Sequence, residues 1–487
     1  MHRSKPRVLM RMLTVATLLR VVAQAAAGQC QVAKLTPDDG AAGDKFGCSV
    51  AISSQWLIAG ARGDDDHGSA SGAAYLFQRC VNTWWLVAKL TAEDASAEDL
   101  FGWSVGLGGE VALVGAPYDD DSGSVSGSAY VFERRGDANW FQVAKLTAGD
   151  AESGDFFGRA VAVSADVAVV GSPQDNDLGT DSGSVYVFER GPGCTWSQTA
   201  KLLPDDGDYG DQFGTSVAID GDVIVIGTPD DEDQGNWSGS AYVFEASHDG
   251  TWSQAAKLLA ADGGPFHSFG EAVAVSGSIA LVGAFDANGL DLDTGAAYVF
   301  QRDARGAWPE VAKLMADDGE SGDRFGRAVA IDGTVAVVGA WADEDLGPRA
   351  GSAYVFVQQQ DRTWLQVSKL VAEDGASDDW FGRALGVSGS MAVIGAQHDD
   401  DQGEDSGSAY VFAVGPDQDG DGVMDACECP GDLNHDWIVD YYDLAVLLAD
   451  WGCDDPHNGC PGDADRDGDT DHADLGLLLA NWGQICP

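Results

Sequence analysis

The sequence is poor in basic residues. Its 487 residues contain 27 Lys and Arg against 79 Asp and Glu, which gives a formal net charge of −52. Such a charge repels the phosphates of nucleic acids and an anionic membrane surface, so neither is expected as a partner. It also destabilises a compact fold by self-repulsion unless cations neutralise it. We therefore expect bound metal or a saline medium, with calcium as the first candidate because most of the acid is Asp.

Long apolar runs are also scarce. One lies near the start, where a basic stretch that ends at Arg11 precedes the run Leu13–Ala27. This order is typical of an export signal, so we expect residues 1–27 to be a signal peptide. No later segment is long and apolar enough to span a bilayer, and nine cysteines fit an oxidising compartment. The protein is therefore expected to be secreted, in the extracellular medium or at the cell surface.

Recognisable catalytic motifs are missing. The eight His are scattered, and the chain has no His-Glu-x-x-His, no Gly-x-Ser-x-Gly and no phosphate-binding loop. Paired carboxylates abound, yet in a chain this acidic they carry little information. The sequence therefore predicts a binding protein and not an enzyme.

An internal repeat occupies most of the chain. A Phe-Gly pair recurs at an almost constant interval, with its Phe at Phe46, Phe101, Phe157, Phe213, Phe269, Phe325 and Phe381. Two further glycines recur in step with that Phe in every copy, as Gly60 and Gly72 do in the first copy and Gly395 and Gly407 in the last. Chance does not produce such regularity, so each copy is one structural unit.

Each copy carries the pattern of four short β-strands. The segments read FGxSVAI, an alternating apolar stretch into VGAP, SGSAYVF and WxQVAKL, with short turns such as Asp220-Gly221 between them. One such sheet cannot bury its apolar faces alone, whereas radial stacking of several sheets buries them against neighbours. The sequence therefore predicts an all-β, seven-bladed propeller over residues 28–415.

The ends of the array predict a closed ring. A first VAKL-type strand, Val32–Leu35, precedes the first Phe-Gly pair, and the last copy stops after Phe412 without such a strand. We expect the N-terminal strand to supply the missing fourth strand of the last blade.

The Phe-Gly pair followed by Gly115-Ala116-Pro117, or by its variants in the other copies, resembles the FG-GAP repeat of the integrin α-subunit propeller and its bacterial relatives, over residues 31–412. In the integrin relatives, calcium sits in an Asp-rich hairpin between the Phe-Gly and Gly-Ala-Pro strands. Here that hairpin is a tight turn in every copy. The resemblance therefore implies the propeller fold without the integrin-type calcium sites.

A different acidic element follows the Gly-Ala-Pro strand. It has the pattern Asp-x-Asp-x-Gly, with the pairs Asp64/Asp66, Asp119/Asp121, Asp175/Asp177, Asp231/Asp233, Asp343/Asp345 and Asp399/Asp401. Copy five has Ala287 and Gly289 instead. Because the copies are related by rotation, these loops are expected to form a ring of carboxylates on one rim. Weak calcium binding and a solvated loop both stay open, since two Asp fall short of the six to eight oxygens that calcium takes.

Two other residues recur once per unit. A Trp opens the outermost predicted strand, and packing between blades is favoured over a sugar-stacking ring for Trp84, Trp140, Trp196, Trp252, Trp308 and Trp364. An Asp lies two residues before the repeated Phe and is interpreted as a turn or capping residue. These are Asp44, Asp99, Asp155, Asp211, Asp323 and Asp379, with His267 in copy five.

After Phe412 the repeat ends, and a second duplication begins, which pairs Asp432 with Asp463 and Trp451 with Trp482. Its two loops place oxygen ligands at positions 1, 3, 5, 7, 9 and 12 of an EF-hand-type calcium loop. The predicted ligands are Asp432, Asn434, Asp436, the carbonyl of Ile438, Asp440 and Asp443 in the first loop, and Asp463, Asp465, Asp467, the carbonyl of Asp469, Asp471 and Asp474 in the second. A helix-sized amphipathic stretch follows each loop, DLAVLLADWG or DLGLLLANWG.

This duplication resembles a dockerin, which implies a small α-helical, EF-hand-like domain over residues 431–487 with calcium as its cofactor and a cohesin-like partner. The two positions that recognise cohesin in the family hold Tyr441/Tyr442 and His472/Ala473 in place of small hydroxyl residues. The linker 416–430 resembles a thrombospondin type 3 calcium repeat. Its predicted ligands are Asp417, Asp419, Asp421, the carbonyl of Val423, Asp425 and Glu428.

Two functions stay open. The first is a secreted, calcium-binding interaction or adhesion protein, whose propeller binds an extracellular protein or polysaccharide and whose tail docks to a partner. The second is a carbohydrate-active enzyme or a non-catalytic subunit of a polysaccharide-degrading assembly, which the dockerin analogy suggests. An active site needs one or two blades to depart from the rest, and only copy five does so, around residues 266–268 and 286–294. The sequence favours the first function.

Overall fold

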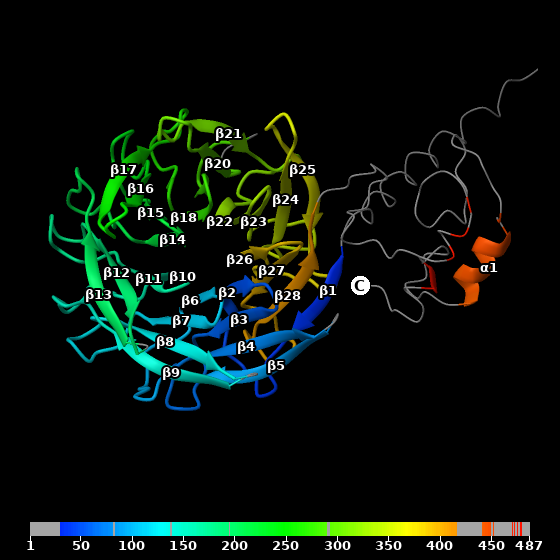
Figure 1. The fold of residues 1–487 in the computed structure, drawn as a ribbon, viewed down its shortest axis with the longest axis horizontal. Helices are drawn as coiled ribbons and strands as arrows, with labels where there is room; N and C mark the ends of the chain where they lie inside the picture. The colour runs from blue at the N-terminus through cyan, green and yellow to red at the C-terminus, as the bar shows by residue number, and fades with distance from the viewer. Residues whose placement is uncertain are drawn as a thin grey trace, which may run out of the picture. The chain divides into compact units, whose positions relative to one another are not determined.

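The structure is a computed structural model of the 487-residue chain. It describes residues 30–80, 83–136, 139–193, 195–289, 293–415 and 441–449, and the single residues 451, 470, 472, 475, 478 and 479. Residues 31–415 form one compact unit. This unit holds seven four-stranded antiparallel sheets, arranged as blades around a common axis (Figure 1). The predicted all-β, seven-bladed propeller is confirmed.

The first strand of each blade in the chain is the innermost one, and the innermost strands of neighbouring blades contact one another around the axis (Figure 1). These innermost strands are β2 (Phe46–Ser53), β6 (Ser104–Gly108), β10 (Ala160–Ser164), β14 (Ser216–Asp220), β18 (Ala272–Ser276), β22 (Phe325–Asp332) and β26 (Ala384–Ser388). The second strands are β3 (Trp56–Ala61), β7 (Val111–Ala116), β11 (Val167–Ser172), β15 (Val223–Thr228), β19 (Ile279–Ala284), β23 (Val335–Ala340) and β27 (Met391–Ala396).

The third and fourth strands follow outward in chain order. The third strands are β4 (Ala73–Cys80), β8 (Ser128–Arg135), β12 (Ser184–Gly191), β16 (Ser240–Ala246), β20 (Ala296–Gln301), β24 (Ser352–Gln358) and β28 (Ser408–Ala413). The outermost strands are β5 (Thr83–Leu90), β9 (Asn139–Leu146), β13 (Thr195–Leu202), β17 (Trp252–Leu258), β21 (Glu310–Leu314), β25 (Trp364–Leu370) and β1 (Gln31–Leu35).

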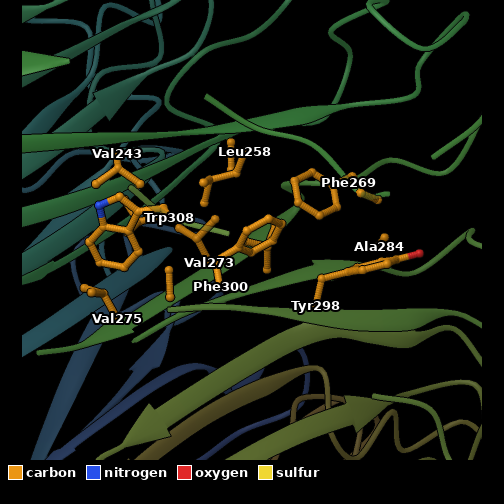
Figure 2. Close-up of a cluster of buried hydrophobic side chains, with 14 of the residues drawn as sticks. Val243, Leu258, Phe269, Val273, Val275, Ala284, Tyr298, Phe300 and Trp308 are labelled. Atoms are coloured by element: carbon orange, nitrogen blue, oxygen red, sulfur yellow. The ribbon is translucent and has the colours of Figure 1, made fainter. Parts of the chain in front are cut away.

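The hydrophobic cores lie between neighbouring blades. Figure 2 shows one of them, in which Val243 and Leu258 of the fourth blade pack with Val273, Phe300 and Trp308 of the fifth. Because a blade packs against a neighbour on each face, its second strand is buried along its whole length, as β7 and β15 are. This is why these strands read as continuous apolar runs and not as alternating patterns.

The Phe-Gly pair ties each blade to the preceding one. Phe269 is 1% exposed, and its ring meets Tyr298 edge-on with the centroids 5.5 Å apart. Its backbone forms a parallel bridge to Gly239 in the preceding blade. Gly270 has a φ of +94°, and a Cβ there would lie 2.2 Å from the carbonyl oxygen of Ser240. A side chain at this position is therefore excluded both by its backbone conformation and by the neighbouring blade.

Strand β1 closes the ring. It pairs antiparallel with β28, with Lys34 opposite Tyr410 and Leu35 opposite Ala409. The last sheet therefore has the order β1-β28-β27-β26, and its outer strand comes from the start of the propeller. The predicted closure is confirmed.

Beyond the propeller, the structure gives the bounds of one helix, α1 (Tyr441–Ala449). It begins two residues before the first amphipathic stretch that was predicted to be helical. Among the described residues, no helix has both the length and the apolar character needed to cross a membrane.

Candidate functional site

Each acidic loop of the propeller surrounds a lysine side chain. In the third blade, Nζ of Lys201 on β13 lies 2.7 Å from a carboxylate oxygen of Asp150, 3.1 Å from one of Asp175 and 2.7 Å from one of Asp177. Asp175 and Asp177 form the Asp-x-Asp-x-Gly pair, and Asp150 comes from the loop that links the second blade to the third. Tyr186 donates its hydroxyl hydrogen towards Asp150 and Asp175. Three chain segments thus meet at one ammonium group.

The same arrangement recurs in six of the seven blades. Its lysines are Lys34, Lys89, Lys145, Lys201, Lys257 and Lys369, each within 3.1 Å of three carboxylates. Burial by itself would lower the pKa of Lys201, but its bonds to Asp150 and Asp177 outweigh burial and raise that pKa above its usual range. The first Asp of each pair is buried, so these loops are not simply solvated.

The ammonium group of each of these lysines lies where a metal ion bound by the same carboxylates would lie. The carboxylate oxygens of Asp39, Asp64 and Asp66 lie within 4.8 Å of one another, close enough to share a metal ion. Lys89 Nζ already lies between 2.6 and 2.8 Å from one oxygen of each. A divalent ion there would meet the ammonium charge at short range, and this repulsion opposes binding. The geometry therefore favours a structural loop that is held together by its lysine over a weak calcium site.

The fifth blade keeps the lysine and loses the Asp pair. Lys313 Nζ lies 2.7 Å from a carboxylate oxygen of Asp262 and donates a hydrogen bond to the carbonyl oxygen of Asn288 at 3.0 Å. Ala287 is fully buried where the other copies place the first Asp. Copy five therefore keeps the lysine that all the copies share but lacks the two Asp carboxylates that contact it in the other copies.

A second group of side chains, which was not predicted as a site, meets near the axis at the same end of the blades. We call it the axial cluster. Its members flank the Phe-Gly pair or closely follow the second strand, and all of them are half-buried. They are Arg62, Trp103, Tyr118, Phe156, Arg159, Gln212, Asp230, Glu271, Phe285, Asp286, Arg324, Arg327, Trp341, Trp380, Arg383 and His398.

Aromatic rings hold the arginines on one side of the axial cluster. The guanidinium carbons of Arg62 and Arg159 lie 4.6 and 5.0 Å from the ring centroid of Trp103. Tyr118 packs beside Trp103 with the centroids 5.9 Å apart, and Phe156 meets Tyr118 edge-on at 5.2 Å. Two guanidinium groups from different blades are therefore fixed on one indole.

A second aromatic group holds Arg383. Its guanidinium carbon lies 5.4 Å from the ring centroid of Trp380 and 6.0 Å from that of Trp341. The rings of Trp341 and Trp380 are 4.7 Å apart, and His398 lies 4.2 Å from Trp380 on the same blade. This side of the cluster again combines a cation with flat apolar surfaces.

The fourth and fifth blades contribute carboxylates to the axial cluster. Glu271 forms an ion pair with Arg327 at 2.9 Å. The side-chain amide of Gln212 donates a hydrogen bond to Asp230. Burial, together with the nearby charge of Glu271, raises the pKa of Asp230 to about 6. The cluster thus has acceptor groups as well as cations.

Charges from several blades act on Arg159. Burial lowers the pKa of Arg159, Glu271 opposes that shift, and Arg327 and Arg62 add to it. These four residues belong to the third, fifth, sixth and first blades, several of which are not neighbours in the ring. Side chains from such blades come within range of one another only near the axis.

The family of the chain follows from a comparison with known protein families. The model of the FG-GAP repeat matches seven segments, residues 30–77, 84–132, 140–188, 196–244, 252–300, 308–356 and 364–412. The chain belongs to the FG-GAP repeat family. A search of curated proteins finds no match. The predicted family is confirmed for the propeller, while the dockerin-like tail stays a prediction.

The repeated Trp of the FG-GAP unit packs between blades. Trp308 is 6% exposed, and its Nε1 donates a hydrogen bond to Glu245 of the preceding blade at 3.1 Å. Trp196 makes the same contact with Glu133 at 3.3 Å. These contacts bear out the predicted inter-blade role and do not fit a ring of exposed sugar-stacking surfaces.

The Asp two residues before the FG-GAP Phe forms a local turn, as predicted. Asp155 accepts a hydrogen bond from the backbone N–H of Glu152, three residues earlier, at 2.6 Å. The same bond occurs at Asp44, Asp99, Asp211, Asp323 and Asp379. All six are 2–7% exposed, and burial raises the pKa of each to about 6.

The predicted calcium ligands of the FG-GAP protein lie outside the described residues, apart from Asp443, whose backbone belongs to α1. This holds for both EF-hand-type loops and for the loop in the linker 416–430. The three sites therefore remain predictions from ligand spacing.

A signal for the axial cluster was present in the FG-GAP repeats themselves. The position directly after the Phe-Gly pair holds residues of five different types in the seven copies, whereas the Phe-Gly pair is constant. That position holds Cys48, Trp103, Arg159, Thr215, Glu271, Arg327 and Arg383. Comparison of the seven copies with one another, column by column, would have found it.

Proposed function

We propose that this protein is a secreted interaction module, in which the FG-GAP propeller binds an extracellular protein or polysaccharide and the tail docks it to a partner. The axial cluster carries this proposal. A repeated scaffold needs the same residues in every copy, so side chains that differ between copies and meet at one place are free to serve binding. Their half-buried state leaves them open to solvent and to a ligand.

The test of binding is a glycan array and an extracellular-protein array probed with the full chain. We expect selective binding by the full chain with and without a chelator, because a lysine ammonium group already lies among the carboxylates of the propeller loops. The variant Trp103→Leu should weaken that binding, whereas Trp196→Phe, which alters an inter-blade contact at the outermost strand, should leave it intact. Binding that is unaffected by Trp103→Leu would contradict a ligand site at the axis.

A carbohydrate-active enzyme is the second candidate, and one observation favours it. Asp230 has a raised pKa and lies within electrostatic range of Glu271, which pairs with Arg327. Two carboxylates with different environments are the arrangement that glycoside hydrolysis uses. Release of reducing sugar from a bound glycan, abolished by Asp230→Asn, would establish the enzyme and overturn the binding role.

The tail is proposed to bind calcium through three loops, on the strength of the ligand spacing at Asp432, Asp463 and Asp417 and the positions that follow them. With a dissociation constant of about 0.1 mM and about 10 mM calcium, each site would stabilise the folded tail by roughly 2.7 kcal/mol. We expect excess chelator to make residues 416–487 sensitive to protease while residues 31–415 stay resistant. Equal resistance of the tail with and without chelator would contradict this proposal.

A further inference from the structure

The axial cluster concentrates positive charge in a protein that has very little of it. Arg62, Arg159 and Arg383 come from the first, third and seventh blades, and within the described ranges none of them has an ion-pair partner. Most lysines of the propeller, in contrast, are paired with carboxylates. In a chain with 79 acidic residues, three guanidinium groups at one place without an ion pair are not required by the scaffold.

The positions of these arginines are set before any ligand arrives. Trp103 holds two of them and Trp380 holds the third. A guanidinium group stacked on a ring keeps its N–H edge free, and that edge matches the two oxygens of a carboxylate. Burial and the charges of Arg327 and Arg62 lower the pKa of Arg383, so the arginines repel one another while the site is empty of anion. A bound anion would relieve this repulsion.

The surroundings of the cluster limit the ligand to a single anionic group. Asp64 lies two residues after Arg62, and Asp119 directly follows Tyr118, so acidic loops adjoin the axial cluster along the chain. Each loop with its lysine keeps a net negative charge, which repels a polyanion at the rim. A ligand with one carboxylate on an otherwise neutral body escapes most of that repulsion.

The other blades supply acceptors and apolar surface for the neutral body. Asp230 and Glu271 are half-buried carboxylates on the fourth and fifth blades, and carboxylates accept hydrogen bonds from hydroxyl groups. Tyr118 and Phe156 pack edge-on against each other, and Phe285 lies against the guanidinium group of Arg327, so this part of the cluster offers ring surfaces. One carboxylate, several hydroxyl groups and a compact ring are the features of a sugar acid.

We infer that the axial cluster binds a sugar acid, with the carboxylate of the sugar between Arg62, Arg159 and Arg383 and its hydroxyl groups towards Asp230 and Glu271. This inference rests on the proposed binding function and names the ligand class for it. A free sugar acid and the terminal residue of a glycan present the same chemistry to the cluster.

Calorimetric titration of the full chain tests the inference. D-Glucuronate is the probe, methyl β-D-glucoside is the uncharged ring, and acetate is the carboxylate without a ring. We expect glucuronate to bind at least about tenfold more tightly than either analogue, since each lacks one of the two sets of contacts. Equal binding of acetate and glucuronate would reduce the site to one for simple anions and overturn the inference, as would no binding of glucuronate.

A second titration separates the two sources of the sugar acid. Its probe is an oligosaccharide that ends in glucuronate at its non-reducing end. Binding at least as tight as that of free glucuronate would support the inference and identify a glycan terminus as the ligand. Binding of free glucuronate alone would support the inference for the free acid.

Two variants locate the site. Arg62→Gln combined with Arg159→Gln should weaken glucuronate binding by about tenfold or more without lowering the melting temperature, because the arginines repel one another. Arg305→Gln combined with Arg362→Gln removes two exposed arginines from hairpins at the opposite end of the blades and should change nothing. If the first double variant does not fold, the single variant Arg383→Gln takes its place. Undiminished binding by a folded axial variant would place the ligand elsewhere.

The inference and the proposed function fail in different ways. A propeller that binds neutral glycans or proteins on the arrays but not glucuronate would refute the sugar-acid site and leave the binding function standing. A propeller that binds none of the array ligands and no glucuronate would refute both.

Discussion

At the scale of single residues, the buried Asp before each repeated Phe combines a structural role with an electrostatic cost. Its carboxylate accepts a backbone hydrogen bond that shapes the entry to the innermost strand. Burial disfavours the ionised form and raises the pKa of Asp155 to about 6, and the charge of Asp175 adds to the shift. At neutral pH the folded protein therefore holds six such carboxylates in the ionised form, although burial disfavours that form.

These carboxylates predict that the propeller becomes more stable when the pH falls from 7 to 5. The folded-state pKa of about 6 lies above the usual Asp value, so the folded state binds more protons than the unfolded state between about pH 4 and 6. Stability therefore falls as the pH rises through that window. The Asp that reaches each blade lysine from the loop between two blades, such as Asp150 at Lys201, has a pKa below its usual range because of that contact, so its contribution is lost only below the usual Asp value. Melting temperatures across pH 4.5–7.5 check the sign.

Asp155→Asn tests the same effect at one site. The amide oxygen can still accept the N–H of Glu152, and the ionised form is removed. We expect the free energy of unfolding to rise by roughly 1–2 kcal/mol at pH 7 and by clearly less at pH 4.5, where the folded-state carboxyl of the wild type is mostly protonated. Asp205→Asn, on the exposed loop after β13, serves as the control. A gain of equal size at both pH values would show that the carboxylate charge is not the cause.

At the scale of one blade, the lysine of the outermost strand joins three segments that are distant in sequence. Lys201 is 51 residues from Asp150 and 26 residues from Asp175. Asp175 is buried, so removal of the ammonium group leaves an uncompensated charge inside the blade. The acidic rim is therefore part of how the blade is held together and not only a source of solubility.

The fifth blade provides a matched comparison for this role. Lys201→Met should lower the free energy of unfolding in urea by about 3 kcal/mol, because three carboxylates lose their cation. Lys313→Met should cost roughly 1 kcal/mol, because the partners of Lys313 in the described part of the blade are one exposed carboxylate and one carbonyl oxygen. Calcium should restore part of the stability of Lys201→Met and leave the wild-type propeller unchanged. Equal losses in the two variants would contradict the role assigned to the buried Asp.

At the scale of the whole propeller, β1 closes the ring because it pairs with β28 and completes the last blade. Each blade buries its core against the next, and the first and last blades reach one another through the innermost strands β2 and β26. Strand β1 adds the outer strand of the last blade and also brings Lys34, whose ammonium group lies 3.0 Å from the buried Asp399. The ring is therefore secured by the segment that precedes the first complete copy.

Deletion of residues 28–35 is expected to open the last blade first. The melting temperature should fall by roughly 5–10 °C, since the deletion removes both a strand and the lysine of that blade. Amide exchange should quicken in β28 and β27 far more than in β11 and β12 on the other side of the ring. A uniform increase in exchange across all blades would contradict a local role of β1.

The fold of the propeller could be predicted from the sequence almost completely, whereas the predicted EF-hand-like tail stays a prediction and the axial site could not be foreseen. The blades repeat at a nearly constant interval, and strand patterns, tight turns and the Phe-Gly pair are local signals that recur in each copy. Ring closure also leaves a local trace, because one strand is present at the start and absent at the end. The role of the lysines was missed, since the contact of Lys201 with Asp150 requires the path between two blades to be known.

The axial cluster depends on the ring as a whole. Arg62 and Arg383 stand at opposite ends of the propeller sequence, and nothing near either residue indicates the other. They come within electrostatic range because the ring brings every innermost strand to one axis. Periodicity along the chain thus specifies the scaffold, whereas the charge and the aromatic surfaces of the binding site arise from contacts between blades that are far apart in sequence.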